Sequence, residues 1–215
     1  HARVFVAEGA RVVLTDLQEP AGQALAAELG ANALFVRHDV SQAQDWDAVL
    51  AATRAAFGPA NVLINNAAMY FIGPVDEADP ERVRKLLDVN IFGSWLGISR
   101  IAPMMREAGG GSIINLSSLA GMRGIPWHGI YGTSKWAIRG LTKTAAYDLG
   151  PSVVVVAKDL LTAFLAACAP HHLAMGHPPP PHSPGAHEAS TGGAAVGQAH
   201  LAEPQRLLAY YEGKE

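Results

Sequence analysis

The alternation of short apolar runs with longer helical patterns over the first 168 residues constrains the fold most strongly. The apolar runs are rich in β-branched residues and predict strands, while the segments between them predict helices. Parallel strands need crossover connections of this length. Strands are expected at 11–16, 33–39, 61–67, 111–118 and 152–157, and helices at 20–29, 42–57, 80–107 and 132–149. We therefore predict an α/β fold with a doubly wound parallel sheet, formed by a domain over residues 1–168.

The composition changes from about residue 169, where Pro, Gly, Ala and His dominate without an apolar period. Such a stretch buries too little apolar surface to offset the cost of ordering its backbone. We expect 169–215 to be a low-complexity, largely irregular tail with at most a short helix at "EPQRLLAYYEG" (203–213). Irregular spacing of its histidines, without a cysteine or carboxylate cluster, favours such a tail over a metal site. These histidines are His171, His172, His177, His182, His187 and His200.

Charge and composition exclude several classes of function. The formal net charge of −3 gives no reason to expect a nucleic acid or an anionic membrane as a partner. The longest near-continuous apolar stretch, "LLTAFLAACA", is shorter than the roughly 20 residues that cross a bilayer. Cys168 is the single cysteine, so an internal disulfide cannot form and a reducing compartment is expected. We predict a cytoplasmic protein without a metal site.

The stretch "IYGTSKWAIRG" places Tyr131 and Lys135 four residues apart at the start of an expected helix. Side chains at this spacing lie on one face of a helix. A free phenol has a pKa of about 10, and a cation within about 4–6 Å lowers that pKa. A tyrosine perturbed in this way can exchange a proton near neutrality. The spacing also arises by chance on amphipathic helices, so the pair needs support from other residues.

Two more polar residues suit such a site. Ser118 stands at the carboxyl end of a predicted strand, where parallel α/β sheets form ligand crevices. Its hydroxyl can donate to a substrate carbonyl oxygen as negative charge grows there. Asn90 falls inside the long expected helix 80–107, where asparagine has poor propensity. Taken alone, Asn90 also fits an ordinary surface or capping role.

The chain resembles the short-chain dehydrogenase/reductase superfamily in six segments that follow the family's order and spacing. These are "ARVVLTD", "RHDV", "LINNAA", "LDVNIFG", "SIINLSS" and "YGTSK". The resemblance covers about residues 3–150, and the stretch 117–150 is most similar to the hydroxysteroid dehydrogenase branch. It implies a Rossmann-like fold and an NAD(P)-dependent oxidoreductase that interconverts an alcohol and a ketone.

The resemblance also implies a role for each catalytic residue. Tyr131 would be the general acid and base at the substrate oxygen. Lys135 would lower the pKa of Tyr131 and hydrogen-bond the nicotinamide ribose. Ser118 would orient the carbonyl, and Asn90 would hold a water that connects Lys135 to solvent. Ser117 is expected to have a structural role, because neighbouring strand residues face opposite sides.

Cofactor choice depends on Asp16, which ends the first predicted strand. A carboxylate there could accept hydrogen bonds from the adenosine ribose and would repel a 2′-phosphate, so NAD is expected rather than NADP. As an alternative, Asp16 could simply cap the next turn. The resemblance implies that Asp39 and Val40 flank the adenine and that Asn66 and Ala67 approach the cofactor through their backbone.

The sequence departs from the family pattern in three places. The glycine-rich loop and the first, central strand should precede residue 1, which lies in an apparent helix. We expect the chain to be a truncated piece, with two strand edges facing a gap. Ala68 stands where the family usually has glycine, which narrows the space for close backbone approach. The His/Pro-rich tail occupies the place of the expected substrate lid.

A bulky apolar alcohol or ketone, such as a steroid, would suit the side chains expected around the pocket, although plain loop packing explains them equally well. These are Met69, Tyr70, Phe71, Leu119, Met122, Trp127 and His128. Helices 80–107 and 132–149 resemble those that pair between subunits in the family, so a homodimer or homotetramer is expected. Apolar faces on both helices could equally pack inward.

Two other functions stay open at this point. A truncated, catalytically inactive relative could survive as a binding or interaction protein. Longer relatives with the same tyrosine and lysine catalyse sugar-nucleotide epimerisation or dehydration. The short chain and Asp16 argue against that second function.

Overall fold

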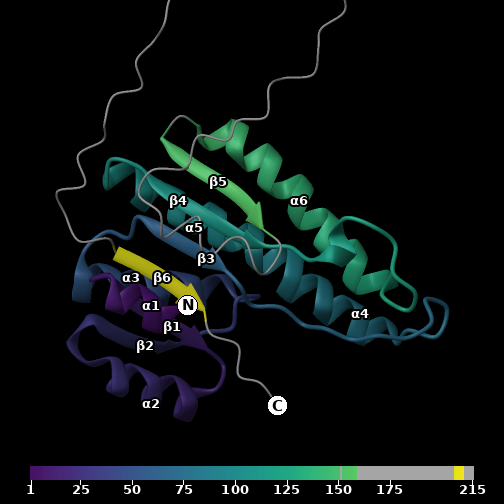
Figure 1. The fold of residues 1–215 in the computed structure, drawn as a ribbon, viewed down its shortest axis with the longest axis horizontal. Coiled ribbons are helices and arrows are strands. Elements are labelled where there is room, and N and C mark those ends of the chain that lie inside the picture. The colour runs from purple at the N-terminus through teal and green to yellow at the C-terminus, as the bar shows by residue number, and fades with distance from the viewer. Residues whose placement is uncertain (151, 159–205, 211–215) are drawn as a thin grey trace, which may run out of the picture.

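The computed structural model describes residues 1–150, 152–158 and 206–210, whose strands and helices alternate along the chain (Figure 1). The strands are β1 (Arg11–Asp16), β2 (Ala33–Arg37), β3 (Val62–Asn65), β4 (Gly111–Leu116), β5 (Val153–Lys158) and β6 (Arg206–Tyr210). The helices are α1 (Ala2–Ala7), α2 (Glu19–Leu29), α3 (Ala43–Phe57), α4 (Pro80–Leu87), α5 (Gly93–Glu107) and α6 (Gly129–Leu149). Short helical turns lie at η1 (Gly30–Asn32), η2 (Asp88–Phe92) and η3 (Leu119–Gly121).

The strands form one parallel sheet in the order β2-β1-β6-β3-β4-β5. Helices pack on both faces of this sheet, which confirms the predicted doubly wound α/β class. Because every strand runs in the same direction, their carboxyl ends meet at one edge.

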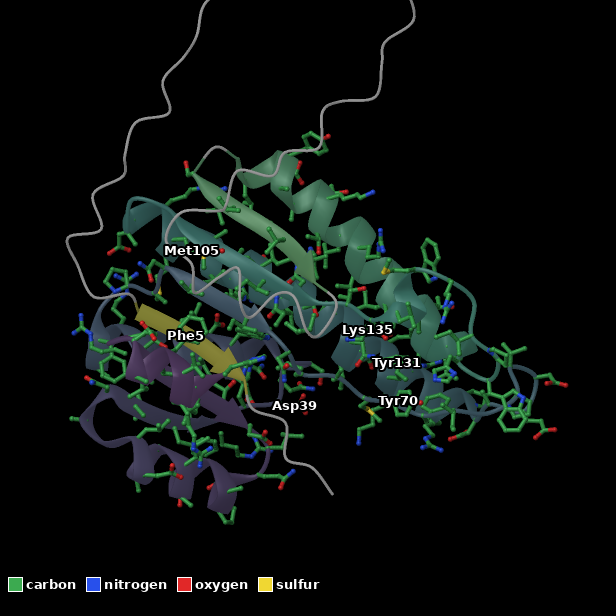
Figure 2. The ribbon with its side chains drawn as sticks, in the orientation of Figure 1. Phe5, Asp39, Tyr70, Met105, Tyr131 and Lys135 are labelled. Atoms are coloured by element: carbon green, nitrogen blue, oxygen red, sulfur yellow. The ribbon has the colours of Figure 1, made fainter. Side chains whose placement is uncertain are left out.

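Side chains of β1 alternate between two cores. Val13 packs with Trp46 of α3 and Met105 of α5 on one face. Val12 packs on the opposite face with Phe5 of α1. Both β1 residues are completely buried, as expected for a strand covered on both sides. Figure 2 labels Phe5 and Met105, which mark the two layers.

The central position of the sheet is taken by β6, between β1 and β3 (Figure 1). Leu208 stands in register with Val13 on one side and with Leu63 on the other. The expected gap is therefore wrong, and residues 206–210 form a strand where the sequence analysis allowed at most a short helix. Unpaired backbone groups at two buried strand edges are costly, and a strand in this position satisfies them.

The segment from 159 to 205, with the histidine-rich stretch and the expected place of the substrate lid, lies outside the described residues. β6 itself belongs to the sheet, although residues 169–215 were expected to form a largely irregular tail. The division of the chain at residue 168 stays a prediction.

The long helix expected over 80–107 is divided by a π-helical turn. Asp79 caps the start, and its carboxylate accepts hydrogen bonds from the backbone N–H groups of Glu81 and Arg82. The turn η2 follows at Asp88–Phe92, before α5 begins at Gly93. Such turns often occur at functional sites, and this one contains Asn90.

Candidate functional site

Several side chains named in the sequence analysis gather at the carboxyl edge of the sheet. Figure 2 shows Tyr70, Tyr131 and Lys135 close together beyond the ends of the strands, with Asp39 nearer to β1. Tyr131 and Lys135 lie in the first two turns of α6. Helix α6 follows β4 and the turn η3, so it begins at the carboxyl edge of the sheet. Ligand crevices of parallel sheets form at this edge.

Tyr131 and Lys135 lie on the same face of α6, as their spacing predicts. The Nζ atom of Lys135 is 5.6 Å from the centroid of the Tyr131 ring. Only 4% of Lys135 is exposed, and its Nζ donates a 2.8 Å hydrogen bond to the carbonyl oxygen of Leu116. This bond ties the ammonium group to the last residue of β4. The charge is thereby held at a fixed position beside the phenol.

Asn90 is buried and makes hydrogen bonds to two parts of the site. Its Oδ1 accepts from the backbone N–H of Met69 at 2.7 Å, and its Nδ2 donates to the Met69 carbonyl at 3.0 Å. The same Nδ2 donates to Ser134 Oγ at 3.0 Å, and Ser134 donates to the Tyr131 carbonyl at 2.7 Å. Asn90 therefore connects the loop after β3 to the turn of α6 that carries Tyr131.

Ser118 stands two residues beyond the end of β4 and caps the turn η3. Its Oγ accepts from the backbone N–H of Ala120 at 3.2 Å. This turn packs closely on α6: a methyl group on Gly121 would lie 2.7 Å from the Lys135 carbonyl oxygen. The buried Ser117 hydroxyl donates to that same carbonyl at 3.2 Å, which agrees with a structural role. The close packing places the turn that Ser118 caps against α6, the helix that carries Tyr131 and Lys135.

Asp16 and Asp39 lie at the ends of neighbouring strands on the other side of β6. Asp16 is 4% exposed and accepts a 2.9 Å hydrogen bond from the Gln18 N–H. Burial raises the pKa of its carboxyl group, while the backbone N–H groups of Gln18 and Leu17 act in the opposite direction. Asp39 accepts from both the backbone N–H and the hydroxyl of Ser41. Asp16 therefore caps a turn, as the alternative reading of this residue held.

The described residues line two hollows at this edge. A small one of about 10 Å³, close to the volume of one water, is lined by Val40, Asn66 and Ala67 among others. A larger one of about 940 Å³ runs from Leu17 and Asp39 past Ala68 and Met69 to α4. Its volume is of the order found for ligand clefts, about 300–1,000 Å³.

A nicotinamide dinucleotide fits this edge in two respects. The carboxylate of Asp39 follows the end of β2 and lines the larger hollow, where a ribose hydroxyl can donate to it, whereas Asp16 at the end of β1 does not line it. The larger hollow has room for an extended ligand between Asp39 and Met69.

Sequence reasoning missed several residues around the site. Ser134, which links Asn90 to Tyr131, and the buried His38 beside Asp39 carried no signal beyond their position next to a motif. Charged side chains of α4 line the larger hollow, among them Arg82, Arg84 and Lys85. The sequence predicted that these charged residues lie on a helix. It did not indicate which side of that helix faces the hollow.

The described residues also bear on metals and membranes. Within 1–150, 152–158 and 206–210, three or more His, Cys, Asp or Glu side chains do not gather in a way that could hold a metal ion. None of the described helices combines the length and the apolar character that crossing a membrane would require.

The sequence profile described as short chain dehydrogenase matches residues 1–162. The chain belongs to this family. One relative is the trans-4-hydroxycyclohexanecarboxylate dehydrogenase of Sinomonas cyclohexanicum, 42% identical over 160 residues, covering 70% of this chain and 61% of that protein. Another is the 3-alpha-(or 20-beta)-hydroxysteroid dehydrogenase of Mycobacterium bovis, 45% identical over 157 residues, covering 73% and 60%.

Among solved structures, the chain is similar to the closed form of a serine dehydrogenase complexed with NADP⁺. The TM-score is 0.70 at 28% identity, and the match covers 73% of this chain and 64% of that one. The chain spans about three fifths of the length of the two curated relatives. The predicted membership of the family is confirmed, including the similarity to hydroxysteroid dehydrogenases.

Proposed function

We propose that this short-chain dehydrogenase catalyses the NAD(P)-dependent interconversion of an alcohol and a ketone. The observation that carries the proposal is the buried ammonium of Lys135, fixed by the Leu116 carbonyl and facing the ring of Tyr131. A positive charge in a position that water reaches poorly stabilises a phenolate, which a proton-transferring tyrosine must form.

We propose the following role for each residue in the reaction. Tyr131 gives its proton to the carbonyl oxygen during reduction and takes it back during oxidation. Ser118 donates a hydrogen bond to the same oxygen as charge develops. Asn90 holds the Met69 loop and the Tyr131 turn together, and its neighbourhood is where a water could connect Lys135 to solvent. The cofactor, when bound, supplies or accepts the hydride.

For the cofactor, we propose NAD rather than NADP. The position of Asp16 at the end of β1 supports this choice, because a carboxylate there would repel a 2′-phosphate and accept bonds from ribose hydroxyls. Asp39 and Val40 would lie at the adenine, Asn66 and Ala67 along the dinucleotide, and Tyr131 and Lys135 at the nicotinamide ribose. The similar serine dehydrogenase is complexed with NADP⁺, and titrations of this chain with NADH and NADPH test the preference.

For the substrate, we propose a cyclic alcohol or ketone with an apolar body. The names of the two relatives, which refer to a hydroxycyclohexane carboxylate and to hydroxysteroids, support this class. Exposed apolar side chains after β3 and between β4 and α6 support it too, with Tyr70, Leu119, Met122 and Trp127 each 45% exposed or more. Assembly into a dimer or tetramer and a cytoplasmic location stay predictions.

The test is NADH consumption by the purified chain over a panel of cyclic ketones, with Tyr131→Phe as the matched variant. Loss of a general acid lowers turnover by about 10²–10⁴-fold, and we expect that loss for Tyr131→Phe. Fluorescence titrations with NADH and NADPH run on the same samples. Cofactor binding without turnover of any ketone would favour the inactive relative that acts as a binding protein. Turnover unaffected by Tyr131→Phe would refute the proposed mechanism.

A further inference from the structure

Tyr70, His128 and Tyr131 form an aromatic cluster at the mouth of the site. The Tyr70 ring meets the Tyr131 ring edge to face, with centroids 4.8 Å apart and an interplanar angle of 87°. The Tyr70 hydroxyl and His128 Nε2 are 3.0 Å apart. The two tyrosines lie close together in Figure 2, although Tyr70 comes from the loop after β3 and Tyr131 from α6.

The hydrogen bond that His128 makes through Nδ1 determines which partner donates in the bond between Nε2 and the Tyr70 hydroxyl. Nδ1 lies 2.8 Å from the carbonyl oxygen of Pro126, which can only accept, so Nδ1 carries the proton. In a neutral imidazole the other nitrogen is then an acceptor. The Tyr70 hydroxyl must therefore donate to Nε2. The proton of Tyr70 is engaged, and its oxygen lone pairs point away from that bond.

The Tyr70 side chain is open to a ligand. Tyr70 is 56% exposed, and among the described residues its hydrogen bond to His128 is the one that the structure records for its oxygen. Because the two rings touch, a cyclic molecule that binds at Tyr131 would lie beside Tyr70. The Tyr70 oxygen therefore presents a hydrogen-bond acceptor on a side chain that adjoins Tyr131.

The backbone around the pair is held in a strained conformation. Trp127, directly before His128, has a φ of 65°, in the left-handed region that bulky residues rarely adopt. Its carbonyl accepts a 2.9 Å hydrogen bond from Gly73 N–H, which joins the loop after β3 to the loop before α6. Strain of this kind persists at ligand clamps, where the surrounding structure fixes the geometry. The conformation sets where His128, and through it Tyr70, stands.

We propose that Tyr70, oriented by His128, is a substrate-contacting residue that accepts a hydrogen bond from a second hydroxyl group of the substrate. The proposal rests on the proposed function, since it places the reacting oxygen at Tyr131. Tyr70 thereby favours the binding of cyclic alcohols that carry a second hydroxyl over that of cyclic alcohols with one hydroxyl. His128 is a positioning residue, because it determines that Tyr70 offers an acceptor rather than a donor.

The test compares cyclohexane-1,4-diol with cyclohexanol as probes. Their dissociation constants are measured by saturation-transfer NMR, with and without NADH, so that alcohol oxidation does not interfere. One hydrogen bond contributes about 3- to 10-fold, and the two equivalent hydroxyls of the diol double this, so the full chain should bind the diol about 6- to 20-fold more tightly. Tyr70→Phe should reduce this ratio to the statistical factor of two equivalent hydroxyls. Tyr147→Phe, the same change at a residue 89% exposed further along α6, should preserve it.

Two variants of His128 test the orientation. His128→Gln retains an acceptor for the Tyr70 hydroxyl and should keep the preference for the diol. His128→Leu leaves that hydroxyl free to rotate and should lose the preference. Equal affinity for the two probes in the unaltered chain, binding of neither, or a preference well above twofold that survives Tyr70→Phe overturns the inference.

Oxidation of both probes with NAD⁺ separates this inference from the proposed function. Diol preference without any turnover contradicts the proposed function alone. Turnover of both probes with equal affinity contradicts the role of Tyr70 alone.

Discussion

Acid should destabilise this protein through one buried histidine, His38. Only 1% of it is exposed, its Nδ1 lies 3.2 Å from Thr15 Oγ1, and its ring meets Trp46 edge to face at 4.4 Å. Its Nε2 is buried without a hydrogen-bond partner among the described residues. Burial lowers the pKa of His38 from 6.5 to about 4, although the charges of Asp45 and Asp39 act to raise it.

The sign and size of the effect follow from this pKa. Because the folded pKa lies below the unfolded one, the unfolded chain binds a proton first as the pH falls. The stability associated with neutral His38 is complete above pH 6.5 and is lost as the pH falls towards about 4. The shift of about 2.5 pKa units at 1.36 kcal/mol each corresponds to about 3 kcal/mol. That is a large share of the roughly 5–15 kcal/mol by which domains are stable.

Urea unfolding at pH 7, 5 and 4 measures this loss, with His38→Asn as the comparison. Asparagine keeps a polar atom for Thr15 but cannot take up a proton. At pH 7 the variant is less stable, because it loses the packing against Trp46. At pH 4 the difference in the free energy of unfolding between the two proteins should have shifted by about 3 kcal/mol in favour of the variant, since only the unaltered chain has lost the His38 contribution. Parallel stability curves for the two proteins would refute the reasoning.

Three further predictions concern the sheet and the site. Asp16→Asn should raise the melting temperature at neutral pH, an advantage that disappears in acid, because the raised pKa means that the charged carboxylate is disfavoured in the fold. In cofactor titrations it should also reduce the preference for NADH over NADPH. Asn90→Ala leaves the Met69 backbone groups unpaired and should lower the free energy of unfolding by about 2–4 kcal/mol in urea titrations. Leu208→Pro removes a backbone donor from the central strand and should lower it by at least about 1–3 kcal/mol, whereas Leu208→Val should not.

The sequence alone predicted the strands β1 to β5 and the helices that have a clear apolar period. The observed strand ends differ from the predicted ones by only a few residues. Strand β4, for example, ends at Leu116 rather than at Ser118. The start of α4 was predictable because Asp79 and Pro80 are strong local signals. Tyr131 and Lys135 share a face because helical spacing alone ensures it.

Other features depend on tertiary contacts that no local pattern encodes. The segment that forms β6 is helix-like in composition, and its strand conformation follows from the unpaired edges of β1 and β3. The π turn at Asn90 accompanies side-chain bonds to Met69, which is 21 residues away. The pairing of Tyr70 with His128 spans 58 residues and depends on how two loops meet.

The most direct measurement of the central claim is the transfer of deuterium from NADH labelled at the transferring position of the nicotinamide ring to a cyclic ketone. The account predicts an alcohol with one deuterium on its carbinol carbon, formed by the unaltered chain and slowed about 10²–10⁴-fold by Tyr131→Phe. An alcohol without the label, or labelled alcohol formed equally fast by both proteins, would contradict it.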